Sequence, residues 1–464
     1  MDTTATYLDA FLVRMKTEGL PELAIRSFAY YYKQLVAGET GLMGEDDISP
    51  VVEIPDYEKL DEAYAAIGHK ELPKTALLKL NGGLGTSMGL KGAKSLLPVR
   101  GDLTFLDIIA QQAIHWDISL LLMNSFSTVS ESRKKLAEYA LLRNDVPQDF
   151  EQHKIPKVSQ ETLEPVQWPA EPALEWCPPG HGDIYTALVT TGTLEALLDA
   201  GIKYVFVSNS DNLGAVYDPL LLGYFAKHNL PFMMEVADRT ESDKKGGHLA
   251  LDNEGNFVLR ESAQCPVEDI NHFQNIDRHK FFNTNNLWVN LEALRDILKE
   301  KDGILGLPMI RNSKTVDSRL HDSTPVYQLE TAMGAAIAVF EGAGAVRVPR
   351  NRFAPVKTTN QLLAVQSDAY IMQSDHTLTL HPGREEQTCV IHLDKLYYSK
   401  VDDLAKRFPY GAPSLLHNTS FQVFGDVHFG RNVVCKGDVT IKNMTEKPVF
   451  IEDNAVLEGE LVFD

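Results

Sequence analysis

The chain has 464 residues, with 44 Lys and Arg against 64 Asp and Glu, which gives a formal net charge of −20. Nucleic acids and anionic membranes are bound through a positive surface, so this acidic balance argues against both as partners. The chain is too long for one ordinary hydrophobic core, so two or three domains are expected. Its composition (44% hydrophobic, 23% charged) is that of a globular protein.

Residues 1–46 are expected to form a helical segment, because Leu8, Phe11, Leu12 and Met15 share one helix face. The chain starts with an acidic stretch that lacks the apolar core of a signal peptide, and no apolar run approaches the ~20 residues of a membrane span. The four cysteines are scattered without a Cys-x-x-Cys pair, which favours neither a disulfide framework nor a zinc site. We therefore expect a cytoplasmic protein with no membrane partner.

Residues 47–365 alternate short apolar runs with amphipathic stretches. Strands are expected at 76–80, 118–124, 203–209 and 231–237, and helices at 105–114, 130–142 and 184–200. Strands separated by helices imply crossover connections, which predicts an α/β domain with a doubly wound, mostly parallel, Rossmann-like sheet. Ligands of such sheets bind at the carboxyl ends of the strands.

Residues 366–464 are expected to form a C-terminal domain, in which apolar residues recur every six positions with glycines between them. The positions are Phe421, Val427, Val433 and Val439, then, after a polar break, Phe450, Val456 and Val462. A six-residue step with turn glycines favours a parallel β-helix, and an ordinary β-meander is the alternative. Because a β-helix can end as an assembly surface, a homo-oligomer through this domain stays open.

The stretch LLKLNGGLGTSMGLKGAKSLLPV, residues 77–99, places a glycine-rich loop with Lys91 and Lys94 after the first expected strand. Neither familiar phosphate loop fits, because the dinucleotide fingerprint needs glycine in place of Met88 and the Walker A loop needs it in place of Ala93. Backbone N–H groups of a glycine nest, beside an ammonium group, still bind polyphosphate well. On composition alone, a glycine-rich turn with two solvated lysines is an equally good interpretation.

The stretch YVFVSNSDNLG ends a near-continuously apolar strand in Asn209, Asp211 and Asn212. A lone aspartate at a strand end often caps a turn or the next helix. At the carboxyl end of a central strand, however, it is well placed to hold Mg²⁺, which prefers one or two carboxylates plus phosphate oxygens. We favour the magnesium interpretation.

Three further motifs lie downstream. WCPPGHGDIY (176–185) encloses His181 in a Gly-His-Gly turn before a helix, and FFNTNNLW (281–288) sets asparagines on a strand, where buried amides need partners. VPRNRFAPVKT (348–358) places Lys357 after the rigid Pro355. A tight turn and a solvated lysine are the ordinary interpretations of the first and the last.

Taken together, the blocks LNGGLGTSMGLKGAKS, PPGHGDIY, SNSDNLG, FNTNNLW, YQLETAMGAAI and FAPVKT resemble the signature blocks of one family, in the same order. It is the eukaryotic-type UTP–glucose-1-phosphate uridylyltransferase family, also called UDP-glucose pyrophosphorylase. The resemblance runs from about residue 75 to the C-terminus, including the terminal β-helix. It departs from the family at Ala93, where proline is usual, and at Leu90, where cysteine is usual.

The resemblance implies the conversion of UTP and glucose 1-phosphate to UDP-glucose and pyrophosphate by in-line attack on the α-phosphorus, with Mg²⁺ as cofactor. A relative that uses another hexose 1-phosphate, or several, is the nearest alternative, and a non-catalytic UDP-sugar sensor is a more distant one. The nucleotide contacts implied are Leu80, Asn81, Gly82, Gly83, Lys94, Gln152 (reading the uracil edge), Gly180, Asn209, Asp211 and Lys357. The sugar phosphate contacts implied are Gly82, Gly83, His181, Asn209, Glu261, Asn286 and Lys357. Lys94 and Lys357 would act as the catalytic cations, and Asp211 as the metal ligand.

Overall fold

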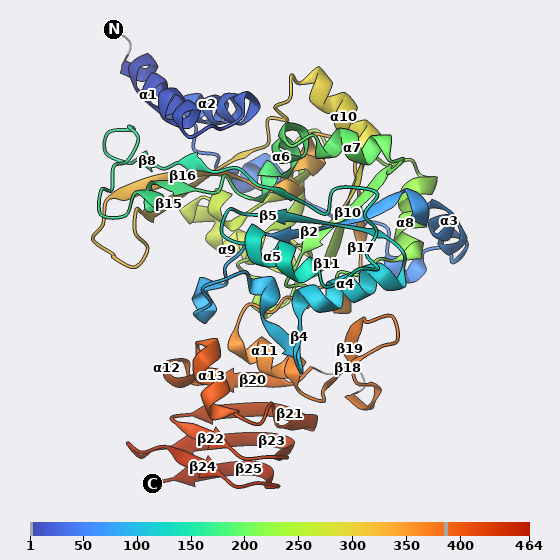
Figure 1. Cartoon of the computed structure of the whole chain (residues 1–464), viewed down its shortest axis with the longest axis vertical. Coiled ribbons are helices and arrows are strands. Elements are labelled where there is room, and N and C mark those ends of the chain that lie inside the picture. The colour runs from blue at the N-terminus through green and yellow to red at the C-terminus, as the bar shows by residue number, and fades with distance from the viewer. Residues whose placement is uncertain (1–2, 385–387) are drawn as a thin grey trace.

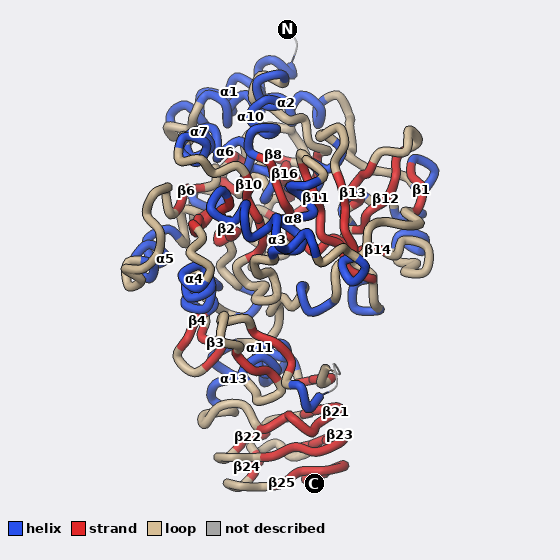
Figure 2. Tube along the Cα trace, turned by 90° about the vertical axis from the view of Figure 1, so that its right-hand side faces the viewer, coloured by secondary structure: helices blue, strands red, loops and turns tan. Residues whose placement is uncertain are grey.

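The computed structural model describes residues 3–384 and 388–464. Two N-terminal helices lie at one end, a large sheet flanked by helices occupies the middle, and stacked C-terminal strands form the other end (Figures 1 and 2). Among the described residues, no helix is both long and apolar enough to cross a membrane.

The central sheet has ten strands, with a main path β1-β12-β14-β10-β2-β5-β6 to which β11, β13 and β17 are attached. Its strands are β1 (Ile48–Pro50), β2 (Thr75–Asn81), β5 (Ser119–Asn124), β6 (Asp149–Glu151), β10 (Tyr204–Asn209), β11 (Phe232–Asp238), β12 (His248–Asp252), β13 (Phe257–Arg260), β14 (Phe281–Asn290) and β17 (Gly344–Arg347). The four strands expected from the sequence are β2, β5, β10 and β11. The expected parallel character is confirmed for most of the sheet, whereas β1, β13 and β14 run against the other strands.

Helices cover both faces of this sheet, because successive residues of a strand face opposite sides. Leu77 of β2 packs in one hydrophobic cluster with α4 and α8, whereas Leu78 packs in a second cluster with α6, α7 and α10. The helices of this region are α3 (Ala63–Glu71), α4 (Phe105–His115), α5 (Val129–Leu136), α6 (Ile184–Thr190), α7 (Thr193–Asp199), α8 (Pro219–Lys227), α9 (Ile270–Phe273), α10 (Leu291–Glu300) and α11 (Thr359–Gln366).

Two helix predictions need correction. The helical pattern at 184–200 forms two helices, α6 and α7, because Gly192 between them takes a left-handed φ of 72°. The pattern at 130–142 is helical only from Val129 to Leu136.

The N-terminal helices α1 (Thr3–Thr17) and α2 (Glu22–Val36) form the expected helical segment. Phe11 and Met15 are fully buried, and they share a cluster with Phe28 of α2 and Leu329 of β16. β16 belongs to a second, three-stranded sheet, which consists of β15 (Met309–Thr315), β16 (Pro325–Thr331) and β8 (Val158–Ser159). A separate two-stranded sheet pairs β7 (Ile155–Pro156) with β9 (Trp176–Cys177). The helical segment therefore packs against the second sheet and the β7–β9 pair.

The described strands from residue 390 onward run parallel to their neighbours, whereas the earlier pair at 370–372 and 378–380 is antiparallel. One sheet contains β20 (Val390–Leu393), β21 (Ser414–Phe424), β23 (Val434–Asn443) and β25 (Val456–Phe463), and a second contains β22 (Val427–Phe429) and β24 (Val449–Ile451). These parallel pairings exclude the β-meander. The helices α12 (Lys395–Tyr398) and α13 (Val401–Arg407) precede β21, and the short pairs β3 (Pro98–Arg100) with β4 (Leu103–Thr104) and β18 (Tyr370–Met372) with β19 (Leu378–Leu380) complete the fold.

The six-residue step is interrupted by the polar break. Phe421, Val427, Val433 and Val439 are all buried. Phe450, Val456 and Val462, by contrast, are 68%, 60% and 50% exposed, and Ile451 and Leu457, one position later, are buried instead. The step fails because the turn before β24 lengthens this coil: Val439 pairs with Phe421, 18 residues back, whereas Val449 pairs with Val427, 22 residues back.

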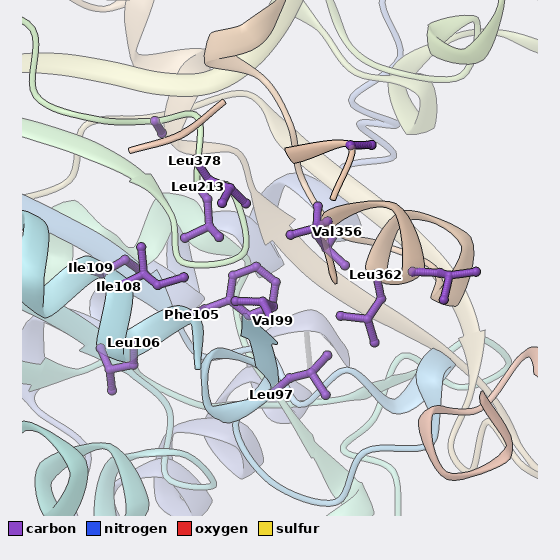
Figure 3. Packing of buried hydrophobic residues seen from close by; sticks show 14 of the residues in the cluster. Leu97, Val99, Phe105, Leu106, Ile108, Ile109, Leu213, Val356, Leu362 and Leu378 are labelled. Atoms are coloured by element: carbon purple, nitrogen blue, oxygen red, sulfur yellow. The ribbon is translucent and has the colours of Figure 1, made fainter. Parts of the chain in front are cut away.

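One hydrophobic cluster joins segments that are far apart in the sequence. Leu97 and Val99, which follow the glycine loop, lie in the same cluster as Val356 and Leu362, on either side of Lys357 (Figure 3). The cluster continues to buried residues of β21 and β23, so apolar packing crosses residue 365. The domain boundaries expected at residues 46 and 365 stay predictions.

Candidate functional site

The glycine loop and the Asp211 loop leave the sheet at the same edge. β2 and β10 are adjacent and parallel, and their last paired residues are Leu80 and Asn209, both half-buried. The chain continues from β2 into the loop that carries Gly82 and Gly83, and from β10 into the loop that carries Asp211. The structure therefore brings these sequence motifs together at the carboxyl ends of neighbouring strands.

Lys94 and Asp211 form the central contact of this edge. The Lys94 Nζ lies 2.5 Å from Asp211 Oδ2, and the two side chains are 14% and 16% exposed. The backbone N–H of Lys94 donates to the Gly83 carbonyl at 3.0 Å, which folds the glycine loop back on itself. Asp211 Oδ1 is buried and has no hydrogen-bond partner among the described residues. One carboxylate oxygen is thus neutralised by Lys94 and the other stays available.

Lys357 reaches the same edge on a loop that is fastened to the Asp211 loop. The Val356 N–H donates to the Asp211 carbonyl at 3.1 Å, and the Ala354 N–H donates to Asn212 Oδ1 at 3.0 Å. The Lys357 side chain is exposed, with its Nζ 5.9 Å from the centre of the Phe353 ring. Its backbone is therefore fixed while its ammonium group stays accessible.

Glu261 lies within the electrostatic reach of Lys357. Burial raises the pKa of the Glu261 carboxyl, and the opposing effects of a hydrogen bond from Asn283 and of the Lys357 charge are smaller. The carboxylate also packs against Gly247, where an added Cβ would lie 2.6 Å from Glu261 Oε2. The structure thus places two of the predicted sugar phosphate contacts near each other.

Gly82 and Gln152 lie side by side. A Cβ added to Gly82 would be 2.6 Å from Gln152 Nε2, so glycine is the residue that leaves room for the carboxamide. Asn81 has a different orientation. Its buried Nδ2 donates to Asn124 Oδ1 and to Ser132 Oγ, both at 2.7 Å, which turns the side chain toward α5. Asn81 Oδ1 has no partner among the described residues, so the side chain retains an acceptor, whereas a hydrogen bond donated to the nucleotide would come from the main-chain N–H.

The His181 turn packs against the end of β16 and the residues that follow it. Gly180 before it has a φ of 80°, and an added Cβ would lie 2.5 Å from the Thr331 carbonyl oxygen. The Met333 N–H donates to His181 Nδ1 at 2.9 Å, so the ring proton lies on Nε2. Burial lowers the pKa of His181 to about 4. The ring is therefore neutral at physiological pH, with Nε2–H as a hydrogen-bond donor.

Asn286 belongs to a buried network around Glu235, whose side chain is fully buried. Arg352 donates from Nε and Nη2 to the Glu235 carboxylate at 2.8 and 2.7 Å, and Asn286 Nδ2 and Trp288 Nε1 donate at 3.0 and 2.9 Å. The Arg352 carbonyl also accepts from Asn212 Nδ2 at 3.1 Å and from Asn286 Nδ2 at 3.2 Å. Asn286 is thus already bonded within the protein, and its contact with the sugar phosphate stays a prediction.

Lys79 lies under the same edge. It is 1% exposed, and its Nζ donates to Ser208 Oγ at 2.7 Å and to the Ala215 carbonyl at 2.6 Å. Burial lowers the pKa of Lys79 to about 7. No role for Lys79, Glu235 or Arg352 follows from the sequence motifs. The available signal was a charged residue inside the apolar runs LLKL and PFMMEVA, because such residues are buried only with partners.

The donors at this edge fit the requirements of Mg²⁺. The described residues contain no group of three or more His, Cys, Asp or Glu side chains that could enclose a metal ion. Mg²⁺ is usually held by one or two carboxylates together with substrate phosphates and water, so a single carboxylate with a free oxygen suffices. Asp211, with its unpartnered Oδ1, meets that condition.

A glycine-rich loop, two lysines and one carboxylate at the carboxyl ends of a mostly parallel sheet define a protein that binds phosphorylated ligands. The chain belongs to the UTP–glucose-1-phosphate uridylyltransferase family, whose pattern it matches over residues 25–436.

Individual relatives agree with this assignment. The chain is 40% identical over 422 residues to the UTP–glucose-1-phosphate uridylyltransferase of Solanum tuberosum, covering 89% of this chain and 84% of that protein. It is 38% identical over 414 residues to the probable enzyme of Schizosaccharomyces pombe, covering 88% and 80%. Among solved structures, a mutant UDP-glucose pyrophosphorylase from Leishmania major is 42% identical over the full length of both chains, with a TM-score of 0.92. Another mutant of that protein, in complex with UDP-glucose, has a TM-score of 0.90, 42% identity and coverage of 98% and 99%.

Proposed function

We propose that this chain converts UTP and glucose 1-phosphate to UDP-glucose and pyrophosphate. The observation that carries the proposal is the Lys94–Asp211 pair, with the free Asp211 Oδ1, at the sheet edge where the Lys357 loop also docks. The names of the relatives supply the substrates, because each of them is a UTP–glucose-1-phosphate uridylyltransferase or a UDP-glucose pyrophosphorylase.

In this reaction a phosphate oxygen of glucose 1-phosphate attacks the α-phosphorus of UTP, and pyrophosphate leaves on the opposite side. Two anions must approach each other, so the protein has to supply positive charge and alignment. The attacking oxygen is already ionised, so neither a protein nucleophile nor a general base is needed. Lys94 and Lys357 would neutralise charge on the phosphates from two separately fixed loops.

Asp211 is the residue that would hold Mg²⁺, through Oδ1. When bound, Mg²⁺ neutralises phosphate charge and orients the phosphate oxygens. Lys94 pairs with Asp211 in the free protein, and the phosphates of UTP offer Lys94 a stronger anionic partner. We infer that nucleotide binding moves the Lys94 ammonium from Asp211 toward the phosphates.

The remaining predicted residues divide into one that would contact the uracil base and three that would contact the sugar phosphate. The carboxamide of Gln152, beside Gly82, would donate to one atom of the uracil edge and accept from its neighbour. The Nε2–H of neutral His181 is a donor suited to the sugar phosphate. Glu261 and Asn286 would complete that subsite.

We further infer that the central domain is Rossmann-like and doubly wound, and that the C-terminal parallel sheets are successive coils of a β-helix. Hydrophobic clusters on both faces of the sheet support the first inference, and the stacked parallel registers support the second. Free thiols at all four cysteines agree with a cytoplasmic location. Exposed apolar residues on β24 and β25 leave the C-terminal domain available as a homo-oligomer contact.

The test is a pyrophosphate-release assay with UTP and a panel of sugar phosphates, including glucose, galactose and N-acetylhexosamine 1-phosphates, with and without Mg²⁺. We expect Mg²⁺-dependent turnover with glucose 1-phosphate. Equal or faster turnover of several other sugars would replace the proposal by a broader UDP-sugar pyrophosphorylase activity. No pyrophosphate release with any sugar phosphate would refute it.

A further inference from the structure

One buried pair joins the segment of Gln152 to the turn of His181. His153 directly follows Gln152, and Asp183 closes the Gly180–Gly182 turn; their side chains are 8% and 7% exposed. The His153 Nδ1 lies 2.9 Å from Asp183 Oδ1 and 3.0 Å from Oδ2, and the backbone N–H of His153 donates to Oδ2 at 2.6 Å. Asp183 therefore binds residue 153 through both its side chain and its main chain.

The orientation of the His153 ring is fixed on both sides. A carboxylate can only accept hydrogen bonds, so the Nδ1 that faces Asp183 carries a proton. On the other side, Nε2 lies 3.0 Å from Thr190 Oγ1 in α6. The three atoms that contact this ring and its backbone N–H thus come from the two ends of one short stretch, 183–190, which is α6 with the residue before it.

The pair restricts the position of Gln152 directly. The Gln152 N–H donates to the Asn124 carbonyl at 2.8 Å, and the next N–H, of His153, donates to Asp183. Both peptide planes next to Gln152 are therefore held, one by β5 and the other by the Asp183 turn. The side chain meets Gly82, which has no room for a Cβ beside Gln152 Nε2.

We propose that Asp183 and His153 are positioning residues that hold the Gln152 carboxamide and thereby set the preference for UTP over CTP. This proposal rests on the proposed function. Uracil and cytosine present opposite donor and acceptor patterns along the same edge, and a carboxamide that can shift or rotate matches either of them. Gln152 discriminates between the bases only if its carboxamide is held in one place.

The experiment measures kcat/KM for UTP and for CTP, each at saturating glucose 1-phosphate. We expect Gln152→Ala to lower the UTP/CTP ratio about fivefold or more, as for one buried hydrogen bond. Asp183→Asn, which keeps the shape of the side chain and loses its charge, should lower the ratio by a similar factor while kcat at saturating UTP changes much less. In the Gln152→Ala background, Asp183→Asn should change the ratio no further, because it acts through Gln152.

Tyr139→Phe is the matched control, because Tyr139 donates at 2.6 Å to another buried carboxylate, Asp107, outside the proposed site. It should lower the thermal stability and leave the UTP/CTP ratio unchanged. His153→Phe keeps the ring and the backbone N–H bond, and it decides the question if Asp183→Asn does not fold. A wild-type UTP/CTP ratio in the folded variants, or additive effects with Gln152→Ala, overturns the positioning role. A wild-type enzyme that turns over neither nucleotide overturns the proposed function instead.

Discussion

The contact between Lys94 and Asp211 leads to a prediction with two effects of opposite sign. In the free protein the Lys94 ammonium lies 2.5 Å from Asp211, and both side chains are largely buried. In the proposed exchange, phosphate competes with the Asp211 carboxylate for the Lys94 ammonium. Asp211→Asn removes the anion and keeps the side-chain shape, so it should tighten the binding of UTP in the absence of Mg²⁺ and nevertheless abolish most of the Mg²⁺-dependent turnover.

The size of the first effect follows from the geometry. A fully exposed ion pair contributes only ~0.2–1 kcal/mol, whereas a hydrogen bond to a charged group contributes ~1.5–3 kcal/mol. With side chains 14% and 16% exposed, the Lys94–Asp211 pair belongs nearer the second range. A factor of ten in affinity corresponds to about 1.4 kcal/mol, so UTP should bind at least ~10-fold more tightly to Asp211→Asn without Mg²⁺. Turnover should fall by ~10²–10³, because a neutral amide is a poor Mg²⁺ ligand.

Isothermal titration of UTP in a chelator-treated buffer measures the first effect, and steady-state kinetics over a range of Mg²⁺ concentrations measures the second. Lys94→Met in the Asp211→Asn background is the control, since it should cancel the gain in UTP affinity. UTP binding that is unchanged or weaker in Asp211→Asn would show that Lys94 does not exchange Asp211 for phosphate. Near wild-type turnover at limiting Mg²⁺ would remove Asp211 as the metal ligand.

Three further predictions concern single residues. Lys357→Ala should lower kcat by ~10²–10³ with little change in UTP affinity, whereas Lys94→Ala should lower both kcat and UTP affinity. Steady-state kinetics together with direct measurement of UTP binding tests this, and a normal kcat for Lys357→Ala excludes its catalytic role. Gly180→Ala should lower the free energy of unfolding in urea by about 1–3 kcal/mol, because the added Cβ would clash with the Thr331 carbonyl at a φ of 80°. The loss should exceed that of Gly101→Ala, where φ is also positive (57°) but the Cβ has open space, and equal losses would contradict the clash. The pKa of His181 falls from 6.5 to about 4 on folding, so between these pH values only the unfolded chain binds a proton at this site. The stability that the folded protein gains from a neutral His181 is therefore present above pH 6.5 and is lost as the pH falls toward 4. His181→Gln should therefore lose less stability than the wild type between pH 7 and pH 4.5, and parallel stability profiles in urea would contradict this.

Much of the fold could be predicted because it depends on local patterns. The strands β2, β5, β10 and β11 are short apolar runs between turn signals, and a strand buried on both faces has no other sequence pattern. The six-residue apolar repeat near the C-terminus predicted the buried residues only as long as successive coils had the same length. After the polar break the apolar side chains that face inward are Ile451 and Leu457, because one longer turn changes which residue of each strand faces the core. A period in the sequence carries no information on the length of the next coil.

The candidate site was predictable for a different reason. The carboxyl ends of parallel strands lie at the same edge of a sheet, so the loops of Lys94 and Asp211 could be expected at one edge. That β2 and β10 are immediate neighbours is a finding of the structure, because the strand order does not follow from the sequence. The bonds that fix those loops could not be predicted. Glu235 and Arg352 are 117 positions apart, and His153 and Asp183 are 30 apart. Which charged side chain pairs with which depends on packing between elements, and no spacing rule in a single sequence specifies it.

With the proposed function, the pairing of charges at this edge would account for how a protein with a net charge of −20 binds the polyphosphate of UTP. Arg352 is neutralised by Glu235, and the buried Lys79 has a pKa lowered to about 7, so neither adds a strong positive field at the surface. Lys94 is held by Asp211 until an anion competes for it. In the proposed exchange, positive charge would become available mainly when phosphate displaces Asp211 from Lys94, and the same displacement would leave the Asp211 carboxylate free for a cation. Nucleotide and Mg²⁺ should then bind with positive coupling, and thermodynamic linkage requires each to raise the affinity for the other by the same factor.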